Sequence, residues 1–232
     1  MDQRPFGPRD SGQPDSRADL DHILWMGGSP CSGKSSIARM LSEANSLHTY
    51  HCDEALRQQG NRITPSGTPN LHKWTSSPWT ELWMRPLHVL LEEAINSYQE
   101  HFGLVLDDLS ALPGSEPVLV EGTCLLPDCV EQVLGNKQNA IWLVPTEEFQ
   151  RAYYPRRGTW VQGIVSQCEN PALALENWLD RDVAFAKWVA SQADLFGLCH
   201  MIVDGQRTIR QSAGLVAGQL GLAWPDTSPD RA

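Results

Sequence analysis

One short segment constrains the fold of this chain more than any other. Residues 28–35 read Gly-Ser-Pro-Cys-Ser-Gly-Lys-Ser, a pattern with two glycines, a lysine and a hydroxyl at fixed positions. Gly28 and Gly33 allow the backbone to turn so tightly that successive N–H groups point at phosphate oxygens. Lys34 then reaches the β- and γ-phosphates of a nucleotide, and Ser35 offers its hydroxyl to Mg²⁺. The segment therefore predicts a phosphate-binding loop.

The residues on both sides of this loop have the form that phosphate binding requires. The apolar run 22–26 predicts a buried strand that leads into the loop, and apolar residues at helical spacing after Lys34 predict a helix. The start of that helix adds the positive end of its dipole. A chance glycine turn is the alternative, and it does not explain the strand and the helix. We expect ATP to contact the whole loop and the residue after it, namely Gly28, Ser29, Pro30, Cys31, Ser32, Gly33, Lys34, Ser35 and Ser36.

Apolar runs and helical stripes alternate along the rest of the chain. Strands are predicted at residues 22–26, 49–52, 117–122, 140–144 and 200–203, and helices after 34 and at 83–98, 146–154, 172–196 and 209–220. The strands are continuous apolar runs rather than alternating ones, which favours a parallel sheet covered by helices on both faces. One α/β domain spanning residues 21–222 accounts for this pattern.

Four segments fall outside the regular pattern. Residues 1–20 contain prolines and aspartates but almost no large apolar residue, so we expect a flexible leader. Residues 60–78 are rich in glycine and proline and predict a long loop. Residues 155–170 are first basic and then polar, which predicts a mobile segment, and residues 223–232 form a tail.

Charge and cysteine content disfavour several classes of protein. The net charge of −10 repels nucleic-acid phosphates, so we expect no general nucleic-acid binding. No apolar stretch approaches the roughly 18 residues of a membrane span, and no apolar run follows a basic start as in a signal peptide. The six cysteines contain no C-x-x-C pair, and we interpret them as reduced thiols. These features predict a cytoplasmic protein with no membrane partner.

Four features, in their order along the chain, resemble P-loop small-molecule and nucleoside kinases of the uridine kinase or antibiotic phosphotransferase type. They are the phosphate loop, Asp53 after the second strand, Glu121-Gly122 after the third, and a basic segment before a long helix. The resemblance covers residues 22–222 in outline. It implies a three-layer α/β/α sandwich whose five-stranded parallel sheet has the order 2-3-1-4-5, with ATP at the carboxyl ends of the strands. It also implies a substrate-binding insertion at about residues 54–116 and an arginine-bearing lid at about 155–170.

The same resemblance gives roles to the two carboxylates. Asp53 would position or deprotonate the acceptor hydroxyl, for which it must lie within hydrogen-bond reach. Its alternative is a helix N-cap, where aspartate is also favoured. Glu121 would hold Mg²⁺ together with Ser35, since this ion takes oxygen ligands and keeps several waters. Its alternative is a charge that caps the end of a strand.

Five arginines are candidates for contacts with phosphate or substrate. Arg156, Arg157 and Arg181 lie in and after the lid-like segment, where guanidinium groups would neutralise the transferring phosphoryl group. Arg57 and Arg85 flank the long loop and would contact the acceptor. Solvated surface charge is the alternative for each of them.

Other residues of this region leave more than one interpretation open. Arg181 has a second alternative as an ion-pair partner of Glu176 or Asp180 on the same helix. The tryptophans at 74, 79 and 83 would stack on a planar substrate or belong to the core. His51 has no partner that the sequence identifies.

The sequence favours an ATP-dependent kinase that uses Mg²⁺ and phosphorylates a small molecule. A nucleotide-dependent switch or regulatory ATPase without such an acceptor is the second hypothesis, and an antibiotic-modifying phosphotransferase is a variant of the first. The chain lacks the Asn-Lys-x-Asp pattern that reads guanine, which disfavours a GTPase. Neither the acceptor nor the oligomeric state follows from the sequence.

Overall fold

Five parallel strands form one sheet in the order β2-β3-β1-β4-β5, which confirms the expected order. The computed structural model describes residues 20–114 and 116–225, so almost all of the expected leader and most of the tail lie outside the described residues. The strands are β1 (Ile23–Gly28), β2 (His48–His51), β3 (Val118–Glu121), β4 (Ala140–Pro145) and β5 (His200–Val203). Each strand is parallel to its neighbours, with β1 between β3 and β4.

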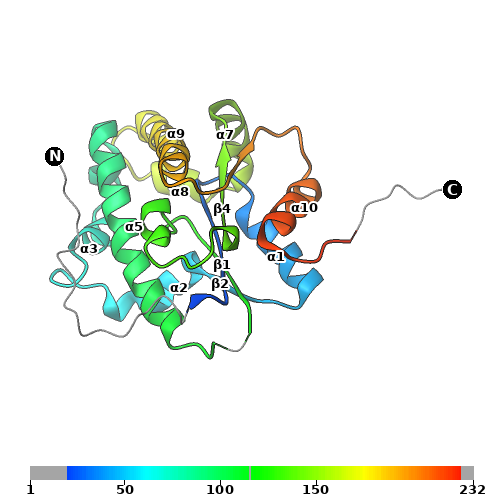
Figure 1. The fold of residues 1–232 in the computed structure, drawn as a ribbon. Coiled ribbons are helices and arrows are strands. Elements are labelled where there is room, and N and C mark those ends of the chain that lie inside the picture. Colours follow the sequence, from blue (N-terminus) through cyan, green and yellow to red (C-terminus); the bar gives the residue numbers. More distant parts are fainter. Residues whose placement is uncertain (1–19, 115, 226–232) are drawn as a thin grey trace.

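Helices cover both faces of this sheet (Figure 1). In chain order they are α1 (Lys34–Asn45), α2 (Cys52–Gln58), α3 (Pro69–Ser76), α4 (Trp79–Trp83), α5 (Leu87–Ser110), α6 (Pro127–Glu131), α7 (Glu147–Tyr153), α8 (Trp160–Val165), α9 (Pro171–Phe196) and α10 (Ile209–Leu220). Short 3-10 turns also occur at η2 (Gln59–Arg62), η3 (Lys137–Asn139) and η4 (Tyr154–Arg157).

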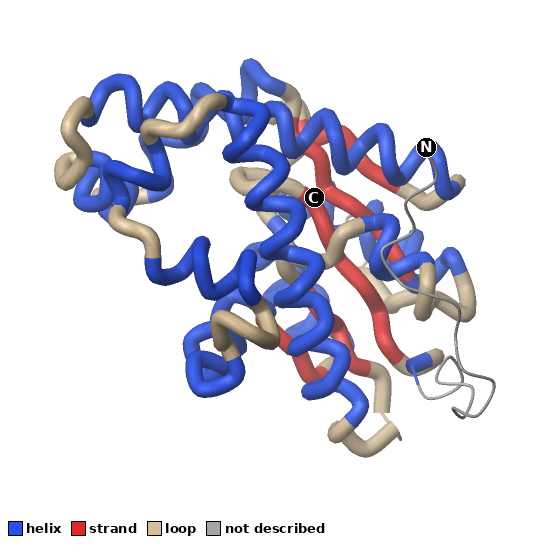
Figure 2. Tube along the Cα trace, turned by 90° about the vertical axis from the view of Figure 1, so that its left-hand side faces the viewer, coloured by secondary structure: helices blue, strands red, loops and turns tan. Residues whose placement is uncertain are grey.

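The two faces of the sheet bury separate cores. Met26 on β1 packs with residues of α1 and α10, whereas Trp25, its neighbour in the strand, packs with residues of α5, α6 and α9. All six residues of β1 are buried, as expected for a central strand whose side chains point alternately to both helical layers. Figure 2 shows the strands side by side, with helices around them. The three-layer arrangement therefore follows from the continuous apolar runs.

A third cluster of buried residues lies outside the sheet and includes part of the segment 155–170, which contains the short helix α8. Val161 and Val165, one helical turn apart on α8, are buried in it together with residues of α4 and α9. At its centre, the rings of Trp83 and Trp178 stack with their centroids 4.0 Å apart. Ile164 and Trp160 of the same helix also contact this cluster. The helix has six residues, which are too few for a clear periodic pattern in the sequence.

The long loop expected at 60–78 is also partly helical. It contains η2 and α3, and the start of α3 is capped from another helix, because the Glu100 carboxylate accepts hydrogen bonds from the backbone N–H groups of Asn70 (3.1 Å) and Leu71 (2.8 Å). This acceptor lies about thirty positions along the chain, so no local pattern announces it. Pro86 stands at the N-cap of α5, which continues to Ser110, well beyond the expected end at Tyr98.

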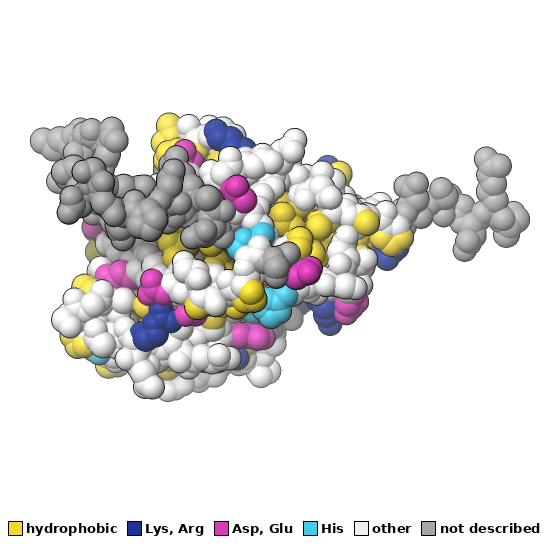
Figure 3. Space-filling view, turned by 60° about the horizontal axis from the view of Figure 1, so that its bottom comes forward, with side chains coloured by type: hydrophobic (Ala, Val, Ile, Leu, Met, Phe, Trp, Pro, Cys, Tyr) yellow, Lys and Arg dark blue, Asp and Glu magenta, His cyan; other side chains and the backbone are white. Residues whose placement is uncertain are grey.

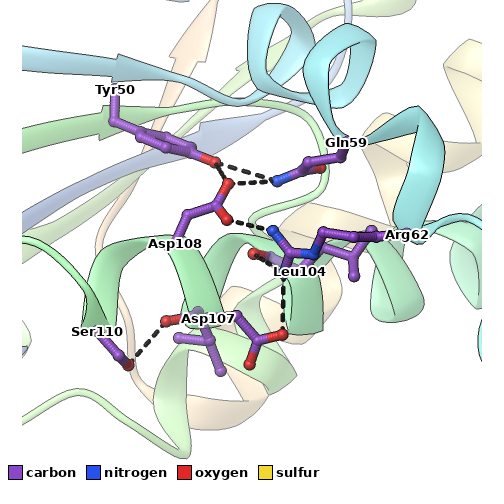
Figure 4. Close-up of polar contacts among 8 residues, drawn as sticks. Tyr50, Gln59, Arg62, Leu104, Asp107, Asp108 and Ser110 are labelled. Carbon is purple, nitrogen blue, oxygen red and sulfur yellow. Dashed lines mark hydrogen bonds and ion pairs between the residues drawn. The ribbon is translucent and has the colours of Figure 1, made fainter.

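A polar network ties the segment around α2 to the far end of α5 (Figure 4). Asp108 accepts hydrogen bonds from the hydroxyl of Tyr50 (2.6 Å) and from the amide of Gln59 (2.6 Å). Arg62 completes the network with a hydrogen bond and ion pair to the same carboxylate. Since Tyr50 precedes α2 and the other two donors follow it, the network fixes both ends of the helix that carries Asp53.

In the tilted view of Figure 3, the Lys and Arg side chains of the described residues lie in separate places and form no continuous patch. Among the described residues, no helix is long and apolar enough to span a bilayer.

The ionisation of Asp108 provides a test of this network. Burial alone would raise its pKa, but the hydrogen bonds from Tyr50, Gln59 and Arg62 outweigh burial and lower it. A lowered pKa means that the charged form stabilises the fold at neutral pH, and that this contribution is lost as the pH falls below the ordinary value of 3.8. We expect Asp108→Asn to reduce the free energy of unfolding by about 1–2 kcal/mol at neutral pH.

Urea unfolding at a series of pH values would measure this effect. The difference in the free energy of unfolding between the native protein and Asp108→Asn should become smaller as the pH is lowered through the acidic range. Asp107→Asn is the matched control, because the side chain of Asp107 is 73 % exposed and its ion pair with Arg62 should contribute less than about 1 kcal/mol. A difference that stayed constant with pH would contradict the role given to Asp108.

Candidate nucleotide-binding site

The phosphate loop turns where the glycines were expected to allow it. Gly28 has a φ of 127° and Gly33 a φ of 83°. A Cβ at Gly28 would lie 2.1 Å from the carbonyl oxygen of Leu143 on β4, so no side chain fits there. Cys31, between the two glycines, also has a left-handed φ, of 66°. Gly33 is the N-cap of α1 and provides no side-chain acceptor, so the first N–H groups of the helix remain available to an anion.

Buried groups from three elements hold the loop in this shape. The N–H of Ser29 donates to Leu143 of β4 (3.2 Å), and its hydroxyl donates to the backbone carbonyl of Asp182 on α9 (3.2 Å). Gln150 on α7, which is fully buried, donates from Nε2 to the hydroxyl of Ser29 (3.1 Å) and to the carbonyl of Pro30 (2.9 Å). Hydrogen bonds to β4, α7 and α9 therefore hold the backbone of the loop in place.

Lys34 lies against the inner side of the loop. Its ammonium group donates to the carbonyls of Gly28 (3.1 Å) and Ser29 (2.9 Å) and to the hydroxyl of Ser32 (3.4 Å). The residue is 8 % exposed, so its charge sits at the wall of the site rather than in bulk water. This is the position from which a lysine attracts phosphate oxygens.

A cavity of about 590 Å³ opens in front of the loop at the carboxyl ends of the strands. Its walls come from the phosphate loop, the start of α2, the end of β3, α7, and the connection from β5 to α10. The lining residues are Pro30, Cys31, Ser32, Gly33, Lys34, Ser35, Ser36, Asp53, Glu121, Thr123, Phe149, Tyr153, Val203, Gly205, Gln206, Arg207, Thr208, Ile209 and Ser212. Seven consecutive loop residues and both predicted carboxylates thus share one cavity.

The strand order gives this cavity two sides. β2 and β3 lie on one side of β1, so Asp53, Glu121 and Thr123 line the cavity on that side of the loop. β4 and β5 lie on the other side, which places Phe149 and Arg207 there. A ligand whose phosphates lie on the loop would therefore have carboxylates on one side and an aromatic ring with a cation on the other.

Asp53 lies in the first turn of α2 and is exposed within the cavity. The N-cap of α2 is His51, so the interpretation of Asp53 as an N-cap was wrong. The predicted second strand was one residue too late, because α2 already begins at Cys52. Asp53 therefore presents its carboxylate to the site from the start of a helix rather than from the end of a strand.

Glu121 ends β3 and is only 6 % exposed. One of its carboxylate oxygens, Oε1, lies 2.9 Å from Nδ1 of His51. Glu121 lines the same cavity as Lys34 and the exposed Ser35. A carboxylate and a hydroxyl are the donors that Mg²⁺ prefers, and this ion takes its other ligands from phosphate and water. The residues therefore fit Mg²⁺, although no group of three or more His, Cys, Asp or Glu suited to a metal occurs in the described residues.

Beneath Asp53 and Glu121, two buried thiols meet a buried imidazole. Cys52 and Cys124 flank these cavity residues in sequence, and both are almost fully buried. Burial alone would raise the pKa of the Cys124 thiol, but its interactions with Cys52 and His101 outweigh burial and lower it. Burial, together with the hydrogen bond to Cys124, raises the pKa of Cys52. Cys52, Cys124 and His101 do not line the cavity themselves but lie next to it in the buried interior.

Arg181 lies outside the cavity lining, between two aromatic rings. Its guanidinium group lies 5.2 Å from the ring centre of Trp74 and 5.1 Å from that of Trp83. Nε is 2.9 Å from a carboxylate oxygen of Asp182, its neighbour in sequence. The alternative that paired Arg181 with Glu176 or Asp180 was therefore wrong about the partner. Arg181 is 4 % exposed, and its positive charge is balanced inside the protein.

The other predicted arginines lie in three different places. Arg156 on η4 is exposed, with its guanidinium group 4.8 Å from the ring centre of Tyr153, which lines the cavity. The side chain of Arg157 lies outside what the structure describes. Arg57 is exposed on α2 and does not line the cavity. Arg85 is held in ion pairs with two glutamates, Glu81 and Glu93, away from the cavity.

The sequence did not indicate most of the residues that line the side of the cavity opposite Asp53. Phe149 packs so closely on Gly205 that a Cβ there would lie 2.7 Å from its ring, which explains the glycine after β5. Thr208 forms a capping box with Gln211 at the start of α10. A threonine three positions before a glutamine at a helix start was a readable signal for this turn. Nothing local indicated that Arg207 lines the cavity.

Comparisons with known proteins add two distant structural likenesses. No protein-family model matches the sequence, and no curated protein matches it. The deoxyadenosine kinase from M. mycoides with bound dATP has a TM-score of 0.46 and 11 % identity, covering 86 % of this chain and 98 % of that chain. Shikimate kinase from Acinetobacter baumannii in complex with shikimate has a TM-score of 0.42 and 16 % identity, covering 89 % and 97 %. At these values neither likeness carries a functional argument.

The fold class is defined by the chain itself. A parallel sheet in the order 2-3-1-4-5, with the phosphate loop between β1 and α1, is the P-loop fold expected from the resemblance to small-molecule and nucleoside kinases. Its ligands bind beyond the carboxyl ends of the strands, which is where the cavity lies.

The hydrogen bonds that Gln150 donates to the phosphate loop lead to a prediction. Gln150→Ala removes the hydrogen bonds to Ser29 and Pro30. The loop would then become ordered only on binding, and this ordering would reduce the net free energy of binding. We expect the affinity for ATP to fall about tenfold, measured by isothermal titration calorimetry. Gln167→Ala is the control, because the amide of Gln167 reaches only the carbonyl of Gly163 near its own helix. If a folded Gln150→Ala bound ATP as tightly as the native protein, the hydrogen bonds of Gln150 would not shape the loop.

Proposed function

We propose that this protein is an ATP-dependent phosphotransferase that moves the γ-phosphoryl group to a hydroxyl of a small molecule, with Mg²⁺. One observation carries the proposal: a single cavity combines a phosphate loop, its lysine and two carboxylates, one at the start of α2 and one at the end of β3. A phosphate loop alone would suit any nucleotide-binding protein. An exposed carboxylate beside it, at Asp53, is the additional feature that a transfer to an acceptor hydroxyl needs.

In the proposed reaction the chain mainly positions the reactants. The loop N–H groups and Lys34 hold the β- and γ-phosphates. Ser35 and Glu121 would hold Mg²⁺, which neutralises charge on the phosphates. Asp53 accepts a hydrogen bond from the acceptor hydroxyl and takes its proton as the oxygen bonds to the γ-phosphorus. The bond between that phosphorus and the bridging oxygen breaks, and ADP leaves with the electron pair.

The segment from η4 to α8 is proposed as the lid of this site. Arg156 and Arg157 precede α8, and Arg156 already lies over a ring that lines the cavity. A small rotation of this segment would bring guanidinium groups towards the phosphates, where they would stabilise the charge spread over the transferring group. Arg181 would support the same reaction indirectly, because it contacts the ring of Trp83 in the aromatic cluster on which α8 packs.

The charges beside Asp53 favour an acceptor without a phosphate or carboxylate group. In the segment between Asp53 and β3, Arg62, Lys73 and Arg85 are each bound to carboxylates of the protein. On the acceptor side of the cavity, Asp53 and Glu121 contribute negative charge. An anion would be repelled there, whereas a neutral or cationic hydroxyl compound would not.

Lys34 and Asp53 give the direct test of phosphoryl transfer. With radiolabelled ATP, Mg²⁺ and a panel of nucleosides, sugars and amino sugars, we expect transfer to an acceptor by the native protein. Lys34→Ala should reduce it by about 10²-fold or more, because the phosphates lose their charge partner. Asp53→Asn should reduce the rate by about 10²–10⁴-fold and leave ATP affinity nearly unchanged.

Glu54→Gln is the matched control for Asp53, since Glu54 is its exposed neighbour and does not line the cavity. Its rate should stay close to that of the native protein. ATP hydrolysis that no acceptor stimulates, and that Asp53→Asn leaves unchanged, would contradict the proposed transfer and favour a regulatory ATPase.

The charge of the acceptor can be tested without knowing its identity. A metabolite extract is separated on an anion-exchange resin, and the unbound and bound fractions are each incubated with radiolabelled ATP and the protein. We expect labelled products from the unbound fraction, which holds neutral and cationic compounds. Products only from the bound fraction would contradict the proposed acceptor class, whereas products from neither fraction would contradict phosphotransfer itself. Lys34→Ala gives the background for both.

A further inference from the structure

Glu121 has one polar neighbour across the sheet, and that neighbour is His51. The two residues are register partners on the parallel strands β2 and β3. Register partners on adjacent strands point to the same face, which brings the side chains together. Nδ1 of His51 and Oε1 of Glu121 are 2.9 Å apart. On the other side of Glu121, its register partner on β1 is Met26, which has no polar group to offer.

The two side chains differ in their access to the site. The side chain of Glu121 is 7 % exposed and lines the cavity, whereas that of His51 is 31 % exposed and does not line it. His51 therefore cannot contact the phosphates or the acceptor from its place in the structure. Any effect of His51 on the site has to pass through Glu121.

A carboxylate that is nearly buried needs a hydrogen-bond donor, because burial removes most of the water around it. Within the described residues, His51 is the side-chain donor recorded for Glu121. A donor at Oε1 holds the carboxylate in one rotamer and leaves Oε2 for another partner. The donation requires the tautomer that carries its hydrogen on Nδ1, which an ionised carboxylate acceptor favours.

We propose that His51 is a positioning residue, which holds Glu121 so that its second oxygen receives Mg²⁺ or a water bound to it. This inference rests on the proposed function, since it concerns the ion that accompanies ATP. Partners of metal ligands orient those ligands, and their loss typically weakens metal affinity about 10- to 100-fold. His51 would thus act on the metal-dependent part of nucleotide binding and not on the part contributed by the phosphate loop.

The experiment measures the affinity for a non-hydrolysable ATP analogue by isothermal titration calorimetry, with Mg²⁺ and with EDTA in its place. We expect His51→Leu to weaken binding about tenfold in Mg²⁺ and to leave binding in EDTA within about twofold of the native protein. His51→Asn should retain most of the affinity in Mg²⁺, because the asparagine amide can donate from nearly the position of Nδ1.

His48→Leu is the matched control. His48 lies at the start of the same strand, is exposed, and is paired in register with Val118, far from the cavity lining. Its affinity should equal that of the native protein in both media. The comparison separates the loss of the contact with Glu121 from a general effect of removing an imidazole from β2.

Two results would overturn the inference while leaving the proposed function intact. If native binding depends on Mg²⁺ but His51→Leu binds equally well in Mg²⁺, Glu121 needs no positioning by His51. If His51→Leu weakens binding equally in Mg²⁺ and EDTA, or if His51→Asn is as weak as His51→Leu, the imidazole supports the fold rather than the carboxylate. By contrast, native binding that shows no dependence on Mg²⁺ would contradict the metal role in the proposed function itself.

Discussion

The rest of the site depends on one constraint, which is that the backbone of the phosphate loop is hydrogen-bonded from behind. The N–H of Ser29 reaches β4, its hydroxyl reaches α9, and Gln150 of α7 holds the loop at two points. Gly28 passes so close to β4 that no side chain fits between them. Because these hydrogen bonds hold the backbone, the loop already has its binding shape before a ligand arrives. Little binding energy then has to be used to order it.

The same loop also meets the aromatic cluster formed by α4, α8 and α9. Cys31, which is half-buried in the loop, packs against this cluster. Tyr154 of η4 donates a hydrogen bond of 2.6 Å to the carboxylate of Asp182, whose backbone carbonyl accepts from Ser29. Apolar packing and a buried hydrogen bond therefore connect the segment of η4 and α8 to the phosphate loop.

How much the sequence could predict follows from the range of the interactions involved. Local patterns in the sequence predict the phosphate loop, the strands and the two carboxylates. The strand order was predicted from the family resemblance. The helix α3 begins where the carboxylate of Glu100 caps it, and the contact of His51 with Glu121 joins residues 70 positions apart. Such partners are visible only once β2, β3 and α5 are assembled. The short helix α8 was missed for a different reason, since a helix of six residues gives too weak a periodic signal.

The placement of the cations decides which of them can neutralise a transferring phosphoryl group. Arg181 is balanced by Asp182 in the interior, and withdrawing it would leave a buried carboxylate without its partner at a cost of about 3–5 kcal/mol. Lys34 and Arg207, in contrast, line the cavity. The strand order puts Arg207 on the side of the loop away from Asp53. Lys34 and Arg207 therefore place positive charge along the loop and on the side of the cavity away from Asp53, whereas Asp53 and Glu121 place negative charge on the opposite side.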